Sequence, residues 1–212
     1  KPQPVQTAFT LSLDTVENMT RAAAENAHRP ILKLKVGTPD DLDRLVAVRD
    51  AAPDAKLVID ANEGWTIDDY HMLIDHLVDM DIAFIEQPFP AGQDACLSDL
   101  DRPIPICADE SAHTSLDLPA LVGKYDCVNI KLDKSGGLTA AIDLKAKAQA
   151  MGFDIMVGCM VGTSLAMAPA LLLASDATLV DLDGPLLLSK DREIPISYDA
   201  HGMHPAPSEL WG

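Results

Sequence analysis

Four short apolar runs, LVID (residues 57–60), AFIE (83–86), ICAD (106–109) and VNIK (128–131), each end in a charged residue. The charged residues are Asp60, Glu86, Asp109 and Lys131, spaced 22 to 26 residues apart, which leaves room for one strand and one helix per step. Uncharged β-type runs that alternate with helical stretches indicate parallel strands buried on both faces. Core packing does not explain a charge at the last residue of such a strand. The carboxyl ends of barrel strands, in contrast, are where catalytic groups lie.

Eight strand candidates follow one another along the chain. They cover residues 9–13, 31–36, 57–60, 83–86, 104–108, 127–131, 154–158 and 178–181. Helix starts are predicted at Asp14-Thr15 and Thr38-Pro39, and amphipathic helices over residues 66–79 and 138–151, with Gly152 as the C-cap of the second. This repeat predicts an α/β fold, a TIM-type (β/α) barrel over residues 1–184. The competing fold is a doubly wound open sheet, but no G-x-G-x-x-G follows the first strand.

Charge and cysteine content limit the partners and the compartment. A formal net charge of −17 at pH 7 argues against nucleic acid and anionic membrane as partners. The four cysteines show no C-x-x-C pair and no zinc spacing, which favours a reduced, cytoplasmic protein. Residues 155–175 are uncharged over a length that could span a bilayer, but glycines and a proline interrupt them, so a strand, a loop and a buried helix are expected. We expect a homo-oligomer.

The charged strand ends predict one site. Because residues i and i+2 of a strand face the same side, Lys33 and Lys35 both point to the barrel interior from the second strand. Acids at the ends of three successive strands are the hard oxygen ligands that magnesium prefers, and the lysines suit proton transfer. Lys131 ends the sixth strand, opposite the second in a ring of eight. We therefore expect Lys35 and Lys131 to face each other.

A second acidic pair, Asp181 and Asp183, ends the eighth strand. It is placed to hold the cationic end of a substrate whose carboxylate lies on the metal. A base on one face and an acid on the other would invert a stereocentre α to that carboxylate, with the metal stabilising the ene-diolate. Taken alone, the pair also fits a simple turn. Asn62 and Asn129 are expected to bond to site residues without binding the metal.

Five motifs carry a resemblance to a known family: KLK (33–35), VIDAN (58–62), IEQP (85–88), CADES (107–111) and NIK (129–131). They resemble the muconate-lactonizing subgroup of the enolase superfamily. The pair Asp181-x-Asp183, followed by Gly184-Pro185, looks like the dipeptide epimerases of the L-Ala-D/L-Glu type.

The resemblance implies a magnesium-dependent isomerase that epimerises dipeptides, with one Mg²⁺ per subunit. It implies roles for ten residues: Asp60, Glu86 and Asp109 bind the metal, Lys35 and Lys131 exchange the α-proton, Lys33 neutralises nearby charge, Asp181 and Asp183 hold the dipeptide ammonium, and Thr10 and Cys159 line the pocket.

The resemblance also implies a domain arrangement and several alternatives. The family carries an N-terminal α+β capping domain, which this sequence does not contain, so we expect a (β/α)7β barrel whose residues 185–212 pack against the missing domain. A cycloisomerase, an N-acylamino-acid racemase or an o-succinylbenzoate synthase would use the same metal and lysines. None of their substrates has a free ammonium, so the second acidic pair, Asp181 and Asp183, disfavours all three reactions. A non-catalytic binding barrel is the alternative from another class, and the preferred dipeptide is left open.

Overall fold

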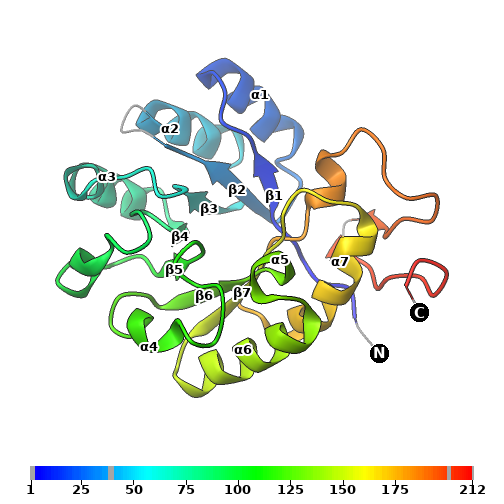
Figure 1. Ribbon diagram of the computed structural model, residues 1–212. Coiled ribbons are helices and arrows are strands. Elements are labelled where there is room, and N and C mark those ends of the chain that lie inside the picture. The colour runs from blue at the N-terminus through cyan, green and yellow to red at the C-terminus, as the bar shows by residue number, and fades with distance from the viewer. Residues whose placement is uncertain (1–2, 38–40, 200–201, 212) are drawn as a thin grey trace. The chain divides into compact units, whose positions relative to one another are not determined.

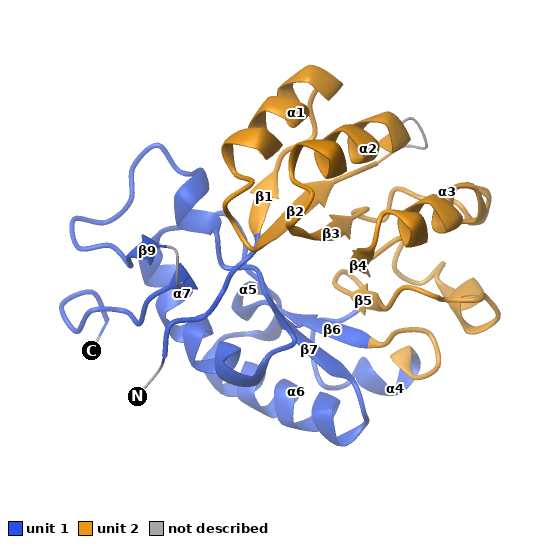
Figure 2. Ribbon diagram, turned by 180° about the vertical axis from the view of Figure 1, so that it is seen from behind, with its two compact units in different colours: residues 1–8, 112–120, 127–212 blue, residues 9–111, 121–126 orange. Residues whose placement is uncertain are grey.

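The computed structural model describes residues 3–37, 41–199 and 202–211. The helix start predicted at Thr38-Pro39 lies outside these residues. The chain divides into two compact units (Figure 2). Unit 1 comprises Lys1–Ala8, Ala112–Ala120 and Cys127–Gly212, and unit 2 comprises Phe9–Ser111 and Leu121–Asp126.

Unit 2 contains the first five strands and the helices that connect them. The strands are β1 (Phe9–Leu11), β2 (Ile31–Lys35), β3 (Lys56–Asp60), β4 (Ile82–Glu86) and β5 (Ile106–Ala108). The connections are α1 (Val16–Glu25), α2 (Leu42–Ala51), α3 (Ile67–Asp79) and the short 3-10 helix η2 (Ala95–Ser98). Successive strands pair in parallel, and the register places Lys35 opposite Asp60 and Asp60 opposite Glu86. Helices α1, α2 and α3 flank these strands in Figure 1.

Unit 1 contains the last three strands of the repeat and most of the helices near them. The strands are β6 (Cys127–Ile130), β7 (Asp154–Val157) and β8 (Leu179–Val180), again parallel and in chain order. The helices are α4 (Leu118–Leu121, which ends in unit 2), α5 (Leu132–Ser135), α6 (Leu138–Ala150), α7 (Ser164–Ala170), η3 (Leu171–Asp176) and η4 (Gly184–Leu187). A short hairpin of β9 (Tyr198–Asp199) and β10 (Gly202–Met203) follows.

The strands are buried on both faces, as their composition predicts. Every residue of β5 and β6 is buried, and so is every residue of β3 after Lys56. A strand covered on both sides cannot show a polar face, so its sequence is a nearly continuous apolar run. Charged residues can then occur only at the strand ends, or inside where another charge compensates them.

Local capping signals explain where the helices begin and end. The Thr66 hydroxyl accepts from the Asp69 backbone N–H, and the Asp69 carboxylate accepts from the Thr66 N–H, a capping box that starts α3. Thr15 caps α1 in the same way through the N–H of Asn18. After α6, Gly152 adopts φ +89°, a left-handed conformation that costs glycine little.

The predicted architecture is confirmed in its elements and their order. All eight expected strands form, and their order along the sheet follows the chain from β1 to β8, which is the arrangement of (β/α) barrel domains. Asp60 and Glu86 end their strands, whereas Asp109, Lys131 and Asp181 come one residue after theirs. Residues 155–175 form part of β7, a loop, α7 and most of η3. Among the described residues, no helix combines the length and apolar character needed to cross a membrane.

Segments from both ends of the described chain pack together in unit 1. Val5 and Met203 exchange two backbone hydrogen bonds, of 3.0 and 2.8 Å. The N–H of Ala8 donates to the carbonyl of Val180 in β8 at 2.8 Å. Met203 in the C-terminal segment therefore has a partner within unit 1, and the packing of residues 185–212 against a capping domain stays a prediction.

The conformation of Gly202 makes this junction sensitive to a single methyl group. Gly202 has φ +108°, and a Cβ there would lie 2.0 Å from the carbonyl oxygen of Val5. Gly202→Ala should therefore lower the free energy of unfolding by about 2–4 kcal/mol, from backbone strain and overpacking together. Gly123→Ala is the matched control, because Gly123 has φ +80° but open space around it, and should cost only the backbone term. Urea denaturation would measure both, and equal losses would contradict the packing argument.

Candidate active site

Three buried carboxylates lie at the carboxyl ends of three adjacent strands of unit 2. Asp60 and Glu86 are fully buried and stand opposite each other in the β3–β4 ladder. Glu86 pairs with Cys107 of β5, and Asp109 lies two residues further along, on the same side as Cys107. Asp109 is also buried. The structure thus brings the three predicted metal ligands to neighbouring strand ends.

The two lysines of β2 compensate this buried charge. The Lys33 ammonium, itself buried, lies 3.1 Å from an Asp60 oxygen and 2.7 Å from a Glu86 oxygen. The Lys35 ammonium lies 2.6 Å from Asp60 and donates to the Asn62 amide oxygen at 2.8 Å. Both lysines therefore point to the side of β2 that carries the acids, as their i, i+2 spacing predicts.

The pKa of Asp60 reflects the same arrangement. Burial by itself raises the pKa of this carboxyl, but the ammonium groups of Lys33 and Lys35 outweigh burial and hold it below its ordinary value. Asp60 is therefore ionised at neutral pH despite its full burial. Asn62, predicted as a neighbour of the site, donates its backbone N–H to Asp60 Oδ1 at 3.0 Å.

The backbone beside these acids adopts conformations that are costly for residues other than glycine. Asn62 and Glu63 follow β3 with φ of +44° and +64°, and Gln87 follows β4 with φ +36°. Such left-handed conformations cost about 1–3 kcal/mol each and persist only where surrounding contacts enforce them. Here the N–H of Glu63 donates to the carbonyl of Gln87 at 2.8 Å, which links the two strained segments.

The side chain of Gln87 fixes the segment that carries Asp109. Its amide oxygen accepts from the backbone N–H groups of Asp109 and Ser111, at 2.9 and 3.1 Å. Its amide nitrogen donates to the carbonyl of Phe89, the Ser111 hydroxyl and the Tyr125 hydroxyl, each at 2.8–2.9 Å. Gln87 is fully buried, so its contacts hold Asp109 in place through the backbone.

A second buried acid, Asp94, continues this network away from the strand ends. Its carboxylate accepts from the hydroxyls of Ser111 and Tyr125, at 2.9 and 2.7 Å, and pairs with the Lys124 ammonium at 2.6 Å. Burial raises the pKa of the Asp94 carboxyl, but these donors lower it by more. The net pKa therefore lies below its ordinary value. Asp94 therefore supports the loop after β5 through its bond to Ser111.

The chemistry of this site fits a divalent cation. Its donors are carboxylate oxygens, with no sulfur or imidazole among them. Negative charge is in excess, because Glu110, next to Asp109, is half-buried as well, and its pKa is raised by burial first and then by Asp109 and Asp60. Among the described residues, no three carboxylate, imidazole or thiol groups converge closely enough to hold a metal ion. Lys33 pairs with Asp60 and Glu86 instead, and the metal assignment stays a prediction.

The remaining predicted residues, apart from Thr10, belong to unit 1. Lys131 is buried and directly follows β6, and its carbonyl accepts from the backbone N–H groups of Lys134 and Ser135. The Asn129 side chain packs against Gly158, where a Cβ would come within 2.5 Å of the amide oxygen. Cys159, one residue on, is half-buried.

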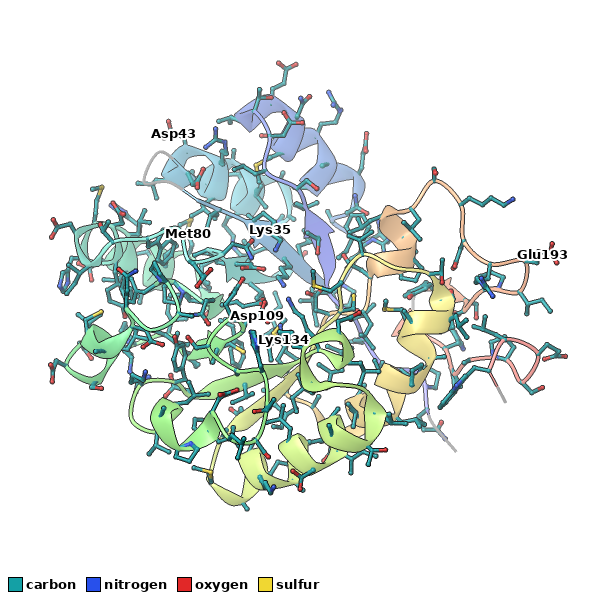
Figure 3. All side chains as sticks on the ribbon, viewed as in Figure 1. Lys35, Asp43, Met80, Asp109, Lys134 and Glu193 are labelled. Atoms are coloured by element: carbon teal, nitrogen blue, oxygen red, sulfur yellow. The ribbon has the colours of Figure 1, made fainter. Side chains whose placement is uncertain are left out.

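Thr10 lies in unit 2, half-buried at the centre of β1 and opposite Lys33 in the ladder. Asp181 and Asp183 follow β8 in unit 1 and are both buried. Their assembly with the metal site, and the opposition of Lys35 and Lys131, stay predictions. Figure 3 labels Lys35, at the end of β2, and Asp109, which follows β5.

Comparison with known proteins identifies the family. The family model described as "Enolase C-terminal domain-like" matches residues 14–186. The chain belongs to the enolase C-terminal domain-like family.

Two curated relatives of this enolase-type barrel are named for reactions at an amino-acid α-carbon. An N-acetyl-D-glutamate racemase of Pseudoalteromonas sp. is 52% identical over 205 residues, which cover 97% of this chain and 65% of the relative. An L-Ala-D/L-Glu epimerase of Escherichia coli is 43% identical over 205 residues, 96% of this chain and 64% of the relative. The chain thus spans just under two thirds of the length of these relatives.

Solved structures share the same barrel. An enolase family member from Agrobacterium tumefaciens with homology to dipeptide epimerases, solved with bound sodium and L-Ala-L-Glu, has a TM-score of 0.98 and 52% identity, over 100% of this chain and 65% of that chain. A dipeptide epimerase from Methylococcus capsulatus, complexed with Mg and L-Arg-D-Lys, has a TM-score of 0.88 and 31% identity, over 96% of this chain and 62% of that chain.

Sequence reasoning missed several residues that shape the enolase-type barrel's candidate site. Gln87 lies in the IEQP motif, but nothing in the sequence around it indicates the five hydrogen bonds that its side chain forms. Thr7 and Tyr198 bond to Leu182, between the two acids after β8, and come from opposite ends of the chain. A surface hollow of about 440 Å³ is lined by residues 191–194, 209 and 210. It includes none of the predicted site residues, and Glu193, labelled in Figure 3, lies on its loop.

The lysine between the buried acids generates a prediction on stability and pH. Lys33→Met should lower the free energy of unfolding at pH 7 by about 3–5 kcal/mol, because it breaks a buried ion pair. In the wild type, the depressed pKa of Asp60 contributes stability that is present above the unfolded-state pKa and is lost only as the pH falls through the folded-state pKa. Without Lys33, only the Lys35 ammonium opposes the effect of burial on Asp60, so the folded-state pKa of Asp60 should rise and the variant should lose less stability than wild type as the pH falls.

The deficit of Lys33→Met relative to wild type should therefore shrink between pH 7 and about pH 4, near the unfolded-state pKa of Asp. Urea denaturation across this range, with EDTA present, would measure it. The matched control is Lys147→Met, which breaks an exposed pair with Asp143 and should change stability little at any pH. A deficit that stays constant with pH would contradict the assignment.

Proposed function

We propose that this chain carries the catalytic barrel of an epimerase that inverts the α-carbon of an N-acylated glutamate, with L-Ala-D/L-Glu as the favoured substrate. The observation that carries the proposal is the cluster in unit 2, where Asp60, Glu86 and Asp109 occupy adjacent strand ends beside Lys33 and Lys35. The names of the relatives support both the reaction type and the acyl-glutamate substrate.

Asp60, Glu86 and Asp109 would hold one Mg²⁺. When bound, the cation supplies positive charge next to the substrate carboxylate, which makes the neighbouring α-hydrogen more acidic. Lys33 contacts Asp60 and Glu86 and would keep both ionised and oriented as ligands. Gln87 would hold the Asp109 backbone at the position from which its carboxylate reaches the same cation.

Lys35 and Lys131 would exchange the α-proton from opposite faces of the substrate. Lys35 lies at the exposed end of β2, with its side chain about one third exposed. A general base must lie within hydrogen-bond reach of the proton that it removes. With the substrate carbon between them, one lysine removes the proton and the other returns it to the opposite face.

A second candidate substrate is N-acetylglutamate, suggested by the name of the relative that is 52% identical to this chain over 205 residues. N-acetylglutamate and Ala-Glu are both N-acylated glutamates, and the alanyl group differs from the acetyl group by one carbon and its free ammonium. Asp181 and Asp183 favour the dipeptide, because two buried carboxylates form charge-assisted hydrogen bonds with an ammonium but not with an acetyl group.

The two-lysine assignment predicts complementary defects in the full-length protein. Lys131→Ala should lower epimerisation about 100-fold or more, yet retain α-proton exchange with one stereoisomer of Ala-Glu in deuterated water. Lys35→Ala should retain exchange with the other stereoisomer only. The control Lys147→Ala, on exposed α6, should exchange both. Loss of exchange with both isomers in both variants, with metal binding intact by calorimetry, would overturn the assignment.

The acidic pair predicts a defect specific to charged substrates. Asp183→Asn should lower kcat/KM for L-Ala-L-Glu by about tenfold or more, the size of one charge-assisted hydrogen bond. It should change kcat/KM little for N-propionyl-L-glutamate, which is the same molecule with the ammonium replaced by hydrogen. A different outcome would be a wild type that prefers N-acetylglutamate, with Asp183→Asn lowering kcat/KM equally for L-Ala-L-Glu and N-propionyl-L-glutamate. In that case the function is racemisation of N-acetylglutamate, and the acidic pair is structural.

A further inference from the structure

The peptide unit that joins Asp181 to Asp183 is held on both sides by side chains. The N–H of Leu182 donates to the Thr7 hydroxyl at 2.8 Å, and the carbonyl of Leu182 accepts from the Tyr198 hydroxyl at 2.8 Å. Leu182 is fully buried, so these two bonds satisfy groups that have no access to water. All of these residues belong to unit 1.

The two hydroxyls are fixed by the backbone around them. Thr7 is followed by Ala8, whose N–H donates to Val180 in β8 at 2.8 Å. Tyr198 lies in β9 opposite Met203, and Met203 forms the two-bond bridge to Val5. Backbone hydrogen bonds therefore connect the segment before β1 with the antiparallel pair of β9 and β10, and Thr7 and Tyr198 lie on these connected segments.

The Leu182 peptide determines where the second carboxylate lies. Asp181 is still tied to β7, since its N–H donates to Val157 at 2.8 Å. Asp183 has left the extended conformation, with φ −89° and ψ 0°, and starts the 3-10 helix η4. Rotation of the intervening peptide would therefore move Asp183 while Asp181 stays in place. Two carboxylates that share one ammonium must both lie within about 2.7–2.9 Å of its nitrogen.

The Tyr198 phenol is suited to a permanent donor role. Burial raises its pKa, and negative charge at Cys159, Asp183 and Asp191 raises it further. Tyr198 therefore keeps its proton at neutral pH and can donate to the Leu182 carbonyl.

We propose that Thr7 and Tyr198 are positioning residues for Asp181 and Asp183, and that they determine how strongly the site prefers a substrate with a free ammonium. The inference rests on the proposed role of this acidic pair. Neither hydroxyl touches the substrate, and both act through the Leu182 peptide. The C-terminal hairpin is then part of the specificity apparatus of the barrel, not only a packing segment.

The test measures selectivity in the full-length protein, as the ratio of kcat/KM for L-Ala-L-Glu to kcat/KM for N-propionyl-L-glutamate. This ratio does not depend on the fraction of folded enzyme, so a merely destabilised variant keeps it. Tyr198→Phe and Thr7→Val should each lower it by about tenfold, mainly through KM of the dipeptide. Thr7→Ser, which retains the hydroxyl, should restore it.

A matched control is available in unit 2. The Tyr70 hydroxyl donates to the carbonyl of Asp101 at 2.9 Å, so Tyr70→Phe removes a comparable tyrosine-to-backbone bond far from the acidic pair in sequence. It should leave the ratio unchanged. In the double variant Asp183→Asn, Tyr198→Phe, the ratio should fall no further than in Asp183→Asn alone, because Tyr198 acts through Asp183.

Two results would overturn the proposal, and they are distinguishable. If Asp183→Asn lowers the ratio but Tyr198→Phe and Thr7→Val do not, the positioning role is wrong and the proposed function stands. If Asp183→Asn itself leaves the ratio unchanged, the acidic pair does not bind an ammonium, and both proposals are wrong.

Discussion

The contact of one lysine ammonium with two fully buried carboxylates is the constraint on which the candidate site depends. Lys33 lies 2.7 Å from Glu86 and 3.1 Å from Asp60, and none of these side chains reaches water to any extent. Buried carboxylates remain ionised only if cations or donors replace the lost hydration. The strand β2 supplies these cations from alternate positions, so its K-x-K pattern and the acids of β3 and β4 form one electrostatic unit.

The loops after these strands carry a conformational cost that the polar network offsets. Asn62, Glu63 and Gln87 all have positive φ, and each follows directly, or within three residues, one of the buried acids Asp60 and Glu86. Gln87 uses its side chain to bind the next loop, which carries Asp109, and Asp94 with Tyr125 supports that loop from behind. Strain and rigidity therefore occur together, as expected where side chains must be held ready for a ligand.

The sequence was sufficient to predict the strands and the charged residues at their ends, because both depend on local patterns. Apolar runs of fixed spacing and caps such as Thr66 and Thr15 mark the elements, and a charge at a strand end is visible without any tertiary contact. Strand lengths were less predictable, since β8 has only two residues. Contacts that join distant segments were invisible: Thr7 and Leu182 are separated by 175 positions, and nothing in either neighbourhood indicates their bond.

The proposed preference for a substrate with a free ammonium rests on the same desolvation argument that explains Lys33. Asp181 and Asp183 are buried two residues apart, and a bound substrate would remove still more water from them. A free ammonium replaces that water with charge-assisted hydrogen bonds, whereas a neutral acetyl group offers no donor at all. A barrel that bound N-acetylglutamate would have reason to lose this pair or to direct it elsewhere. The peptide between the two acids is held by two side-chain hydrogen bonds, which satisfy its buried N–H and carbonyl and also restrict the position of Asp183.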